Sequence, residues 1–210
     1  MVFSRVAYPV ALVVVVVAAL ILPLRRVRRL TGRWPVGVLR NPSPVERLVN
    51  GLLLLLALGC AAWAVAYAWL GAAALGVRSG PPALQWVGWL VVAAGIAIVF
   101  TAQMQMGRAW RLGIDAEATP LITAGLFRTV RNPIYSGIIL VLGGLLLVSP
   151  AWVLLGMIVA IVALLAVQTR REERHLRALH GDAFDRWAAG TGRFVPWLGR
   201  IRPPSARPAA

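Results

Sequence analysis

The sequence predicts an all-α fold, a polytopic transmembrane bundle of about five helices with a C-terminal helical hairpin and a cytoplasmic amphipathic helix. The first observation is the composition: 60% of the 210 residues are hydrophobic and 14% are charged, with a mean hydropathy of +0.77. Such a chain is too apolar to cover the surface of a soluble domain. The second observation is a set of apolar runs long enough to cross a hydrocarbon layer of about 30 Å. The third is the distribution of arginine along the chain.

Three apolar runs, residues 6–24, 48–70 and 84–104, are each predicted to form one membrane-spanning helix. The first run has the length of a signal-peptide core. However, a single Arg precedes it, a basic cluster follows it, and no small-residue cleavage site comes after it. This is the wrong order for a cleaved signal peptide. We therefore expect the first run to remain as an anchor and first span.

A fourth apolar stretch covers residues 134–167. As one helix it would be roughly 50 Å long, which is too long for a single span. Ser149 and Pro150 interrupt it near its middle, so the sequence predicts a hairpin of two short helices, 134–149 and 151–168. Small residues in the first of these helices are predicted to let a neighbouring helix approach closely: Gly137, Gly143 and Gly144.

The positions of the basic residues predict the orientation in the membrane, because short loops rich in Arg stay on the cytoplasmic side. Segments 25–47, 105–133 and the tail from 169 onward hold seven, four and nine Arg. The alternate segments hold only Arg5 and Arg78. With five crossings, the N-terminus is predicted to be outside and the C-terminus cytoplasmic. The predicted outer ends also carry aromatic residues, which favour the membrane interface: Tyr67, Trp69, Trp86, Trp89 and Trp152.

The segment after the last span is predicted to form an amphipathic helix on the bilayer surface. Its apolar residues recur at near-helical spacing: Leu176, Leu179, Phe184 and Trp187. We divide the chain into the N-terminal transmembrane helices, residues 1–104, a core of residues 105–200 that carries the chemistry, and a disordered tail of residues 201–210.

Several classes of function are disfavoured by the sequence. The predicted spans hold no ionisable residue, which argues against an ion pump or a proton-coupled transporter. Cys60, the single cysteine, cannot form an internal disulfide or a zinc site alone. His175 and His180 lack neighbouring metal-type ligands, so we expect them to be solvated or interfacial and we expect no metal site. The basic charge follows the membrane topology, and we expect no nucleic-acid partner.

Residues 121–137, LITAGLFRTVRNPIYSG, contain the first candidate site. Asn132 is a good N-cap residue and Pro133 suits the first helical position. The free N–H groups that follow form a site for an anion such as a carboxylate, and Arg131 adds a fixed positive charge beside it. The alternative is that Arg-Asn-Pro only starts a helix at the membrane interface, which the physics alone favours.

The second candidate site lies at the end of the last predicted span. Glu172 and Glu173 stand at the membrane boundary, close to four basic residues. Taken alone, this pattern favours surface ion pairs with Arg170, Arg171, Arg174 or Arg177. A carboxylate that binds a ligand is the other interpretation.

Taken together, these stretches carry a more specific pattern. The order is Leu-Ile-Thr-x-Gly-x-Phe, Arg-Asn-Pro-x-Tyr-x-Gly, an apolar hairpin, Glu-Glu-x-x-Leu and a closing Arg-Phe-Val-Pro. It resembles the isoprenylcysteine carboxyl methyltransferase family and its phospholipid methyltransferase relatives. The resemblance covers roughly residues 101–197, and the first two predicted helices carry no comparable signature.

The resemblance implies that S-adenosylmethionine binds in a cytoplasm-facing pocket while a lipophilic substrate arrives from the bilayer. Arg131 is then the candidate catalytic residue. The family's substrate-contacting arginine position holds Gln168 here, with Arg171 nearby, and these two are the candidates for substrate contact. On the family pattern the positions that contact the cofactor are Leu121, Ile122, Phe127, Asn132, Pro133, Tyr135 and Glu172.

The function we expect is methyl transfer from S-adenosylmethionine to a small lipophilic acceptor, in a bacterial inner (plasma) membrane. The sequence has no Gly-x-Gly-x-x-Gly loop, which argues against a soluble methyltransferase of the Rossmann type. A membrane reductase that uses a nicotinamide cofactor, a non-enzymatic membrane scaffold and a transporter are the alternatives. The sequence leaves open whether oxygen, nitrogen or sulfur accepts the methyl group, and it does not indicate an oligomeric state.

Overall fold

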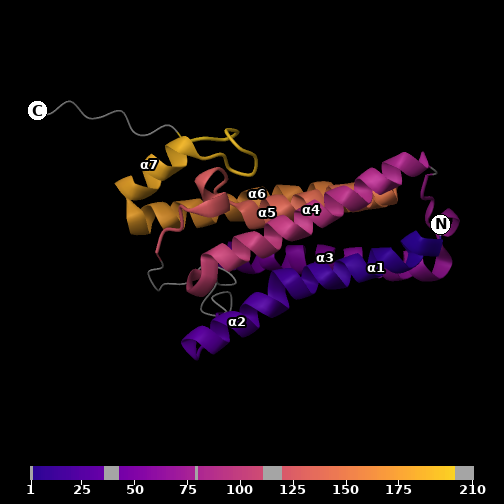
Figure 1. The fold of residues 1–210 in the computed structure, drawn as a ribbon, viewed down its shortest axis with the longest axis horizontal. Helices are drawn as coiled ribbons and strands as arrows, with labels where there is room; N and C mark the ends of the chain where they lie inside the picture. Colours follow the sequence, from indigo (N-terminus) through magenta and orange to yellow (C-terminus); the bar gives the residue numbers. More distant parts are fainter. Residues whose placement is uncertain (1, 36–42, 79, 111–119, 202–210) are drawn as a thin grey trace, which may run out of the picture.

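In a computed structural model of the protein, residues 2–35, 43–78, 80–110 and 120–201 are described. Within these ranges the regular structure is helical, which confirms the predicted all-α bundle (Figure 1). The predicted disordered tail, residues 201–210, lies outside the described residues except for Ile201, whose backbone N–H donates to Ala188. The long helices are α1 (Val2–Val16), α2 (Leu22–Thr31), α3 (Pro44–Leu70), α4 (Pro82–Met106), α5 (Pro133–Val148), α6 (Trp152–His180) and α7 (Asp182–Gly190).

Four helical segments in the described part of the chain are long and apolar enough to cross a membrane: Arg5–Thr31, Pro44–Leu70, Pro82–Ala109 and Trp152–His180. The protein is therefore an integral membrane protein. The shorter apolar helix α5 completes the five predicted elements. Figure 1 shows the N-terminus at one end of the bundle and α7 at the other, as an odd number of passes requires.

The first span is continuous but not uniformly α-helical. A π-helical turn, Val17–Ile21, joins α1 to α2. Such turns insert one extra residue into a helix and are common at functional sites. The carbonyl oxygen of Ala19 in this turn accepts a 2.7 Å hydrogen bond from Nε2 of Gln103 in α4. The first span is thereby joined to α4 by a buried polar contact.

Helices α4 and α5 pack in antiparallel contact through glycine. A Cβ atom built at Gly144 would lie 2.6 Å from the carbonyl oxygen of Gly88, and one at Gly137 would lie 2.7 Å from that of Gly95. No side chain fits there, so the two backbones touch. The predicted close approach is confirmed at Gly137 and Gly144, but it is wrong at Gly143, where a Cβ atom would meet nothing within 4 Å.

The predicted hairpin turns where expected, because α5 ends at Val148 and α6 begins at Trp152. However, α6 continues to His180, well beyond the predicted end at residue 168. The Arg, Glu, Leu and Ala residues that follow the apolar run are good helix formers, so the helix extends beyond the end of that run. Gly181, with φ of +49°, ends it.

The predicted amphipathic surface helix is therefore divided between the end of α6 and α7. Its apolar face also has a different partner from the one predicted. Phe184 is buried, and Trp187 donates a 2.8 Å hydrogen bond from Nε1 to the carbonyl oxygen of Phe127. At Phe184 and Trp187, α7 covers the protein itself and not the bilayer.

The core lies where α1, α3, α5 and α6 meet. Tyr8 and Tyr67 contact each other there, with ring centroids 5.2 Å apart, and Cys60 is buried beside them as a small apolar residue. The placement of Tyr67 among interfacial aromatics was therefore wrong. By contrast, Trp69 and Trp152 are 84% and 70% exposed, as expected for a membrane interface.

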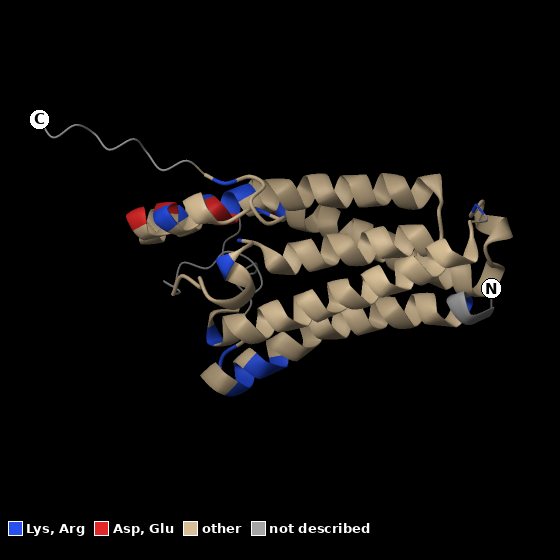
Figure 2. Ribbon diagram, turned by 45° about the horizontal axis from the view of Figure 1, so that its top comes forward, with Lys and Arg blue, Asp and Glu red and all other residues tan. Residues whose placement is uncertain are grey.

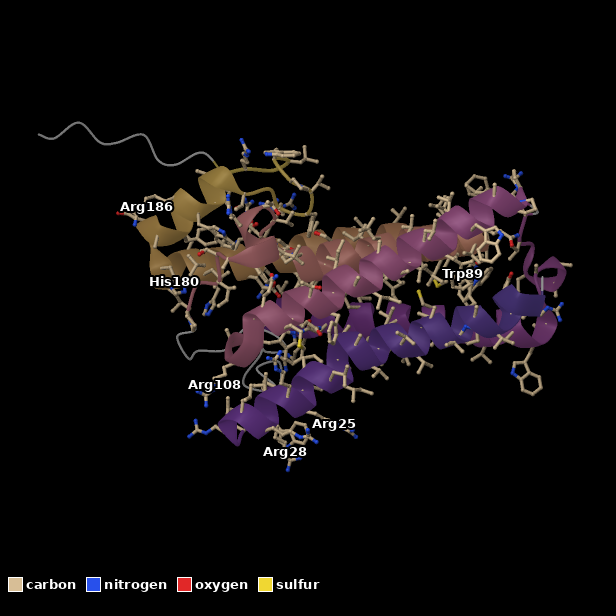
Figure 3. All side chains as sticks on the ribbon, viewed as in Figure 1. Arg25, Arg28, Trp89, Arg108, His180 and Arg186 are labelled. Atoms are coloured by element: carbon tan, nitrogen blue, oxygen red, sulfur yellow. The ribbon has the colours of Figure 1, made fainter. Side chains whose placement is uncertain are left out.

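Most of the basic residues gather at one end of the bundle (Figure 2). Figure 3 shows Arg25, Arg28, Arg108 and Arg186 at this end, whereas Trp89 lies toward the other. The predicted separation of charge along the chain is thus a separation in space. That this Arg-rich end faces the cytoplasm stays a prediction.

Candidate functional site

A cavity of about 290 Å³ lies at the Arg-rich end, between the end of α4, the start of α5, the later part of α6 and α7. This volume is near the lower end of the range for small-molecule sites. Most of the residues singled out from the sequence line it: Leu121, Ile122, Phe127, Arg131, Asn132, Pro133, Tyr135 and Glu172. Residues 50 positions apart in the sequence thus share one wall.

The segment before α5 is shaped by a glycine and a glutamine. Gly125 has φ of +62° and begins a 3-10 turn, Gly125–Arg128. The Oε1 atom of Gln105, in α4, accepts a 2.8 Å hydrogen bond from the backbone N–H of Leu126. A Cβ atom at Gly125 would lie 2.4 Å from the Gln105 amide, so only glycine fits this turn. The turn buries Phe127 in the cavity wall.

The first turn of α5 presents free donors to the cavity. Asn132 occupies the N-cap position and Pro133 the first helical position, as predicted. The side chain of Asn132 makes no capping bond, contrary to expectation, and instead donates from Nδ2 to the carbonyl oxygen of Arg193, 3.3 Å away. The N–H groups of Ile134 and Tyr135 therefore have neither an intrahelical acceptor nor a side-chain cap. Both residues line the cavity.

Glu172 faces this turn from α6. Its Oε1 atom accepts a 2.7 Å hydrogen bond from the hydroxyl of Tyr135 and a 3.0 Å bond from Nε2 of Gln168. Among the described residues no arginine lies within ion-pairing distance of Glu172. Surface ion pairing, the interpretation that the pattern alone favoured, is therefore wrong for Glu172.

Glu173 is the carboxylate that pairs with arginine. Its Oε1 atom lies 2.8 Å from Nε of Arg131, and its Oε2 atom lies 2.7 Å from Nη2 of Arg193. The side chains of Arg131 and Glu173 are only 1% and 8% exposed. A buried pair of this kind is tolerated only when its remaining donors and acceptors are satisfied.

Arg131 meets this requirement through backbone carbonyl groups. Its Nη1 atom donates to Ala188 and Thr191, and its Nη2 atom donates to Gly199 at 2.7 Å. Four of its five N–H donors are thus used within the protein. We had expected this guanidinium to be available to a ligand. It lines the cavity, but its contacts join the start of α5 to α6, α7 and the chain after α7.

The two candidates for substrate contact lie outside the cavity wall. Nη2 of Arg171 donates to Oγ of Ser43 at 2.8 Å and lies 3.2 Å from Oε1 of Glu46, at the start of α3. Gln168 supports Glu172 from the preceding turn of α6. Position 171 is turned by about 100° from position 172 on the helix, which explains why the two neighbours face different elements.

Some cavity residues escaped prediction. His175, expected to be solvated or interfacial, lines the cavity with Glu172 and Leu176. The signal for it was present, because positions i, i+3 and i+4 share one face of a helix. No motif marked the others, which come from the first span, from α4 and its end, and from α7: Ala19, Gln103, Met106, Trp110 and Trp187.

The cavity joins two kinds of surface. One part has the Glu172 carboxylate, the His175 imidazole and the free N–H groups of α5, with aromatic rings around them. The other is formed by residues of the first span, α4 and α5, including the Gln103 amide, whose Oε1 atom has no donor among the described residues. A mostly apolar cavity with a few convergent polar groups is typical of a small-molecule site.

Comparison with known proteins gives one family. Residues 83–183 match the phospholipid methyltransferase family, which confirms the resemblance to phospholipid methyltransferase-like membrane enzymes. The match includes α4, α5, α6 and nearly all of the cavity residues, whereas α1, α2 and α3 precede it. No curated protein matches the chain.

Proposed function

We propose that this chain, with its match to a family of membrane methyltransferases over residues 83–183, transfers a methyl group from S-adenosylmethionine to a lipophilic acceptor drawn from the bilayer. One observation carries the proposal. The Glu172 carboxylate, free of any arginine partner among the described residues, shares a cavity with the unbonded N–H groups at the start of α5.

The cavity residues fit the chemistry of this cofactor. The N–H groups of Ile134 and Tyr135, at the positive end of the α5 dipole, suit an amino-acid carboxylate. Glu172 suits an ammonium group or ribose hydroxyls, because a carboxylate accepts charge-assisted hydrogen bonds. The rings of Phe127 and Trp187 favour a cationic sulfur nearby. The cofactor supplies an activated methyl group on a sulfonium.

The same cavity reaches the membrane-embedded part of the bundle. Ala19 from the first span, Gln103 and Met106 from α4, and Ile138 from α5 form this side of its wall. These residues suit an acyl or prenyl chain next to a polar head. Because the helices around them are apolar, such an acceptor would enter from lipid without crossing water.

Methyl transfer requires alignment of donor and acceptor more than it requires a strong acid or base. Holding two reactants in line contributes about 7–11 kcal/mol to lowering such barriers. Arg131 has a positioning role in this proposal, because its four hydrogen bonds fix the start of α5 against α6 and α7. His175 lines the same cavity and is placed to accept a proton from an acceptor that loses one.

Isothermal titration calorimetry of the detergent-purified protein is the first test. We expect saturable binding of S-adenosylmethionine and none of NADPH. In a second step, incubation with a mixed lipid extract and cofactor labelled at the methyl group should transfer the label to the lipid fraction. Binding of NADPH alone would favour a membrane reductase, and binding of neither ligand would favour a scaffold. Either result would overturn the proposal.

A further inference from the structure

The chain after α7 carries three apolar side chains that are exposed together. Val195, Trp197 and Leu198 are 54%, 74% and 70% exposed. They lie in one short turn, residues 195–198, which we call the 195–198 loop. Scattered apolar side chains on a surface are ordinary, but a contiguous apolar group that includes tryptophan indicates a contact.

The loop has a fixed conformation. The backbone N–H of Arg193 donates to the carbonyl oxygen of Leu198 at 2.7 Å, and that of Leu198 donates to Val195 at 3.2 Å. Trp197 has φ of +65°, a conformation that residues other than glycine rarely adopt. The exposure of the three apolar side chains therefore belongs to an ordered turn.

The residues that directly precede the loop are joined to the start of α5. The carbonyl oxygen of Phe194 accepts a 2.6 Å hydrogen bond from Oγ of Ser136, and that of Arg193 accepts one from Asn132. The backbone N–H of Arg131 donates to Gly192 at 2.8 Å. Since α5 is an apolar helix of the membrane bundle, the loop lies near the end of this helix that holds the Arg-rich segments. Figure 1 shows the yellow chain after α7 turning back along the bundle beside α5 and α6.

We propose that the 195–198 loop inserts into the interfacial layer of the bilayer at the Arg-rich end, with phospholipid as its partner. Tryptophan favours this layer. Arg200, which is exposed close by, suits the anionic headgroups above it. The proposal does not depend on the methyltransferase activity.

This contact would couple the membrane to the cavity. Arg193 and Phe194, which directly precede the loop, accept hydrogen bonds from Asn132 and Ser136. Gly199, which directly follows the loop, accepts one from Arg131. Asn132 and Arg131 line the cavity. Lipid that holds the loop therefore also holds the first turn of α5, where the free N–H groups lie.

Depth-dependent fluorescence quenching tests the proposal. In a Cys60→Ala background, Leu198→Cys is labelled with an environment-sensitive fluorophore and reconstituted into phospholipid vesicles. The quenchers are lipids with a nitroxide near the headgroup, lipids with a nitroxide near the acyl-chain end, and aqueous iodide. Ala183→Cys, exposed on α7, is the matched control for water, and Leu55→Cys, 64% exposed on α3, is the control for the membrane interior.

We expect the probe at position 198 to be quenched several-fold more than the probe at 183 by the headgroup nitroxide, and several-fold less by iodide. The probe at 55 should respond most to the deep nitroxide. Iodide quenching at 198 equal to that at 183 would place the loop in water and overturn the proposal. Protection from all three quenchers would mean that protein, such as a second copy of this chain, covers the loop, which would also overturn it. A labelled Trp197→Cys variant repeats the measurement if Leu198→Cys fails to fold.

Discussion

The hydroxyl of Tyr135 donates a 2.7 Å hydrogen bond to Oε1 of Glu172, which joins the first turn of α5 to α6 across the wall of the cavity. These residues are 37 positions apart in the sequence and each belongs to a different motif. Their contact places the two motifs in one site.

Glu172→Gln tests the role of this carboxylate. The amide oxygen can still accept the hydrogen bond from Tyr135, so the fold should persist while the charge is lost. A charge-assisted contact with a ligand contributes about 1.5–3 kcal/mol, which corresponds to roughly tenfold weaker binding or more. We expect that loss for S-adenosylmethionine in calorimetry. Asp182→Asn, at an exposed position of α7, is the matched control and should bind normally. Wild-type affinity in folded Glu172→Gln would reject the assignment.

The Arg131–Glu173 pair is predicted to matter for stability. Arg131→Met leaves the buried Glu173 carboxylate without its principal partner, which typically costs about 3–5 kcal/mol. We expect a clearly lower midpoint of thermal unfolding in detergent. Arg177→Met is the comparison, because Arg177 is 46% exposed, so solvent screens its pair with Asp185 more than it screens the buried Arg131–Glu173 pair, and the loss should be smaller. The double variant Arg131→Met/Glu173→Met should recover part of the loss. Equal effects of Arg131→Met and Arg177→Met would contradict this prediction.

The glycine contact between α4 and α5 gives a prediction with an adjacent control. Gly144→Leu inserts a side chain where a single Cβ atom already meets the Gly88 carbonyl oxygen, and we expect a destabilisation of about 1–3 kcal/mol or more. Gly143→Leu gains the same helix propensity but enters open space, so it should be neutral or stabilising. Thermal unfolding of both variants checks the difference. An unchanged midpoint for Gly144→Leu would show that the two helices do not touch there.

His175→Gln tests the proposed acceptance of a proton. If His175 takes a proton from the methyl acceptor, the variant should lose roughly 10²–10⁴-fold in kcat, the usual contribution of such a group. Its affinity for S-adenosylmethionine should change little. A normal kcat in the folded variant would show that His175 only lines the cavity.

Orientation in the membrane is open to direct labelling. The Arg distribution predicts that the loop between α3 and α4 is external and that α7 is cytoplasmic. In a Cys60→Ala background, a membrane-impermeant maleimide added to intact cells should label Ala74→Cys and spare Ala183→Cys, both of which are exposed positions. Permeabilised cells should show labelling of both. Labelling of Ala183→Cys in intact cells would reverse the topology.

Hydropathy and glycine placement were enough to predict the spans, the hairpin and two of the close glycine contacts. The extent of α6 was underestimated because the helix continues through charged residues after the apolar run ends. Of the cavity residues that lie on α5 and α6, the motifs predicted Pro133, Tyr135 and Glu172. The sequence could not indicate that Ala19, Gln103 and Trp187 line the cavity, since their positions there depend on how helices distant in the sequence pack together. The sequence could not predict the partners of Arg131 either, because three of them are backbone carbonyl groups, which every residue has.

The backbone contacts at Gly88–Gly144 and Gly95–Gly137 have a mechanical consequence. Because no side chains lie between the two backbones at these positions, we expect α4 and α5 to move as one rigid unit. Gln103 lies about two turns beyond Gly95 in α4, and Tyr135 lies just before Gly137 in α5. The distance between these two cavity residues therefore depends on the packing of α4 against α5. We expect an opening that admits a ligand to come from parts outside this rigid unit: the π-helical turn at Val17–Ile21, or the end of α6 with α7.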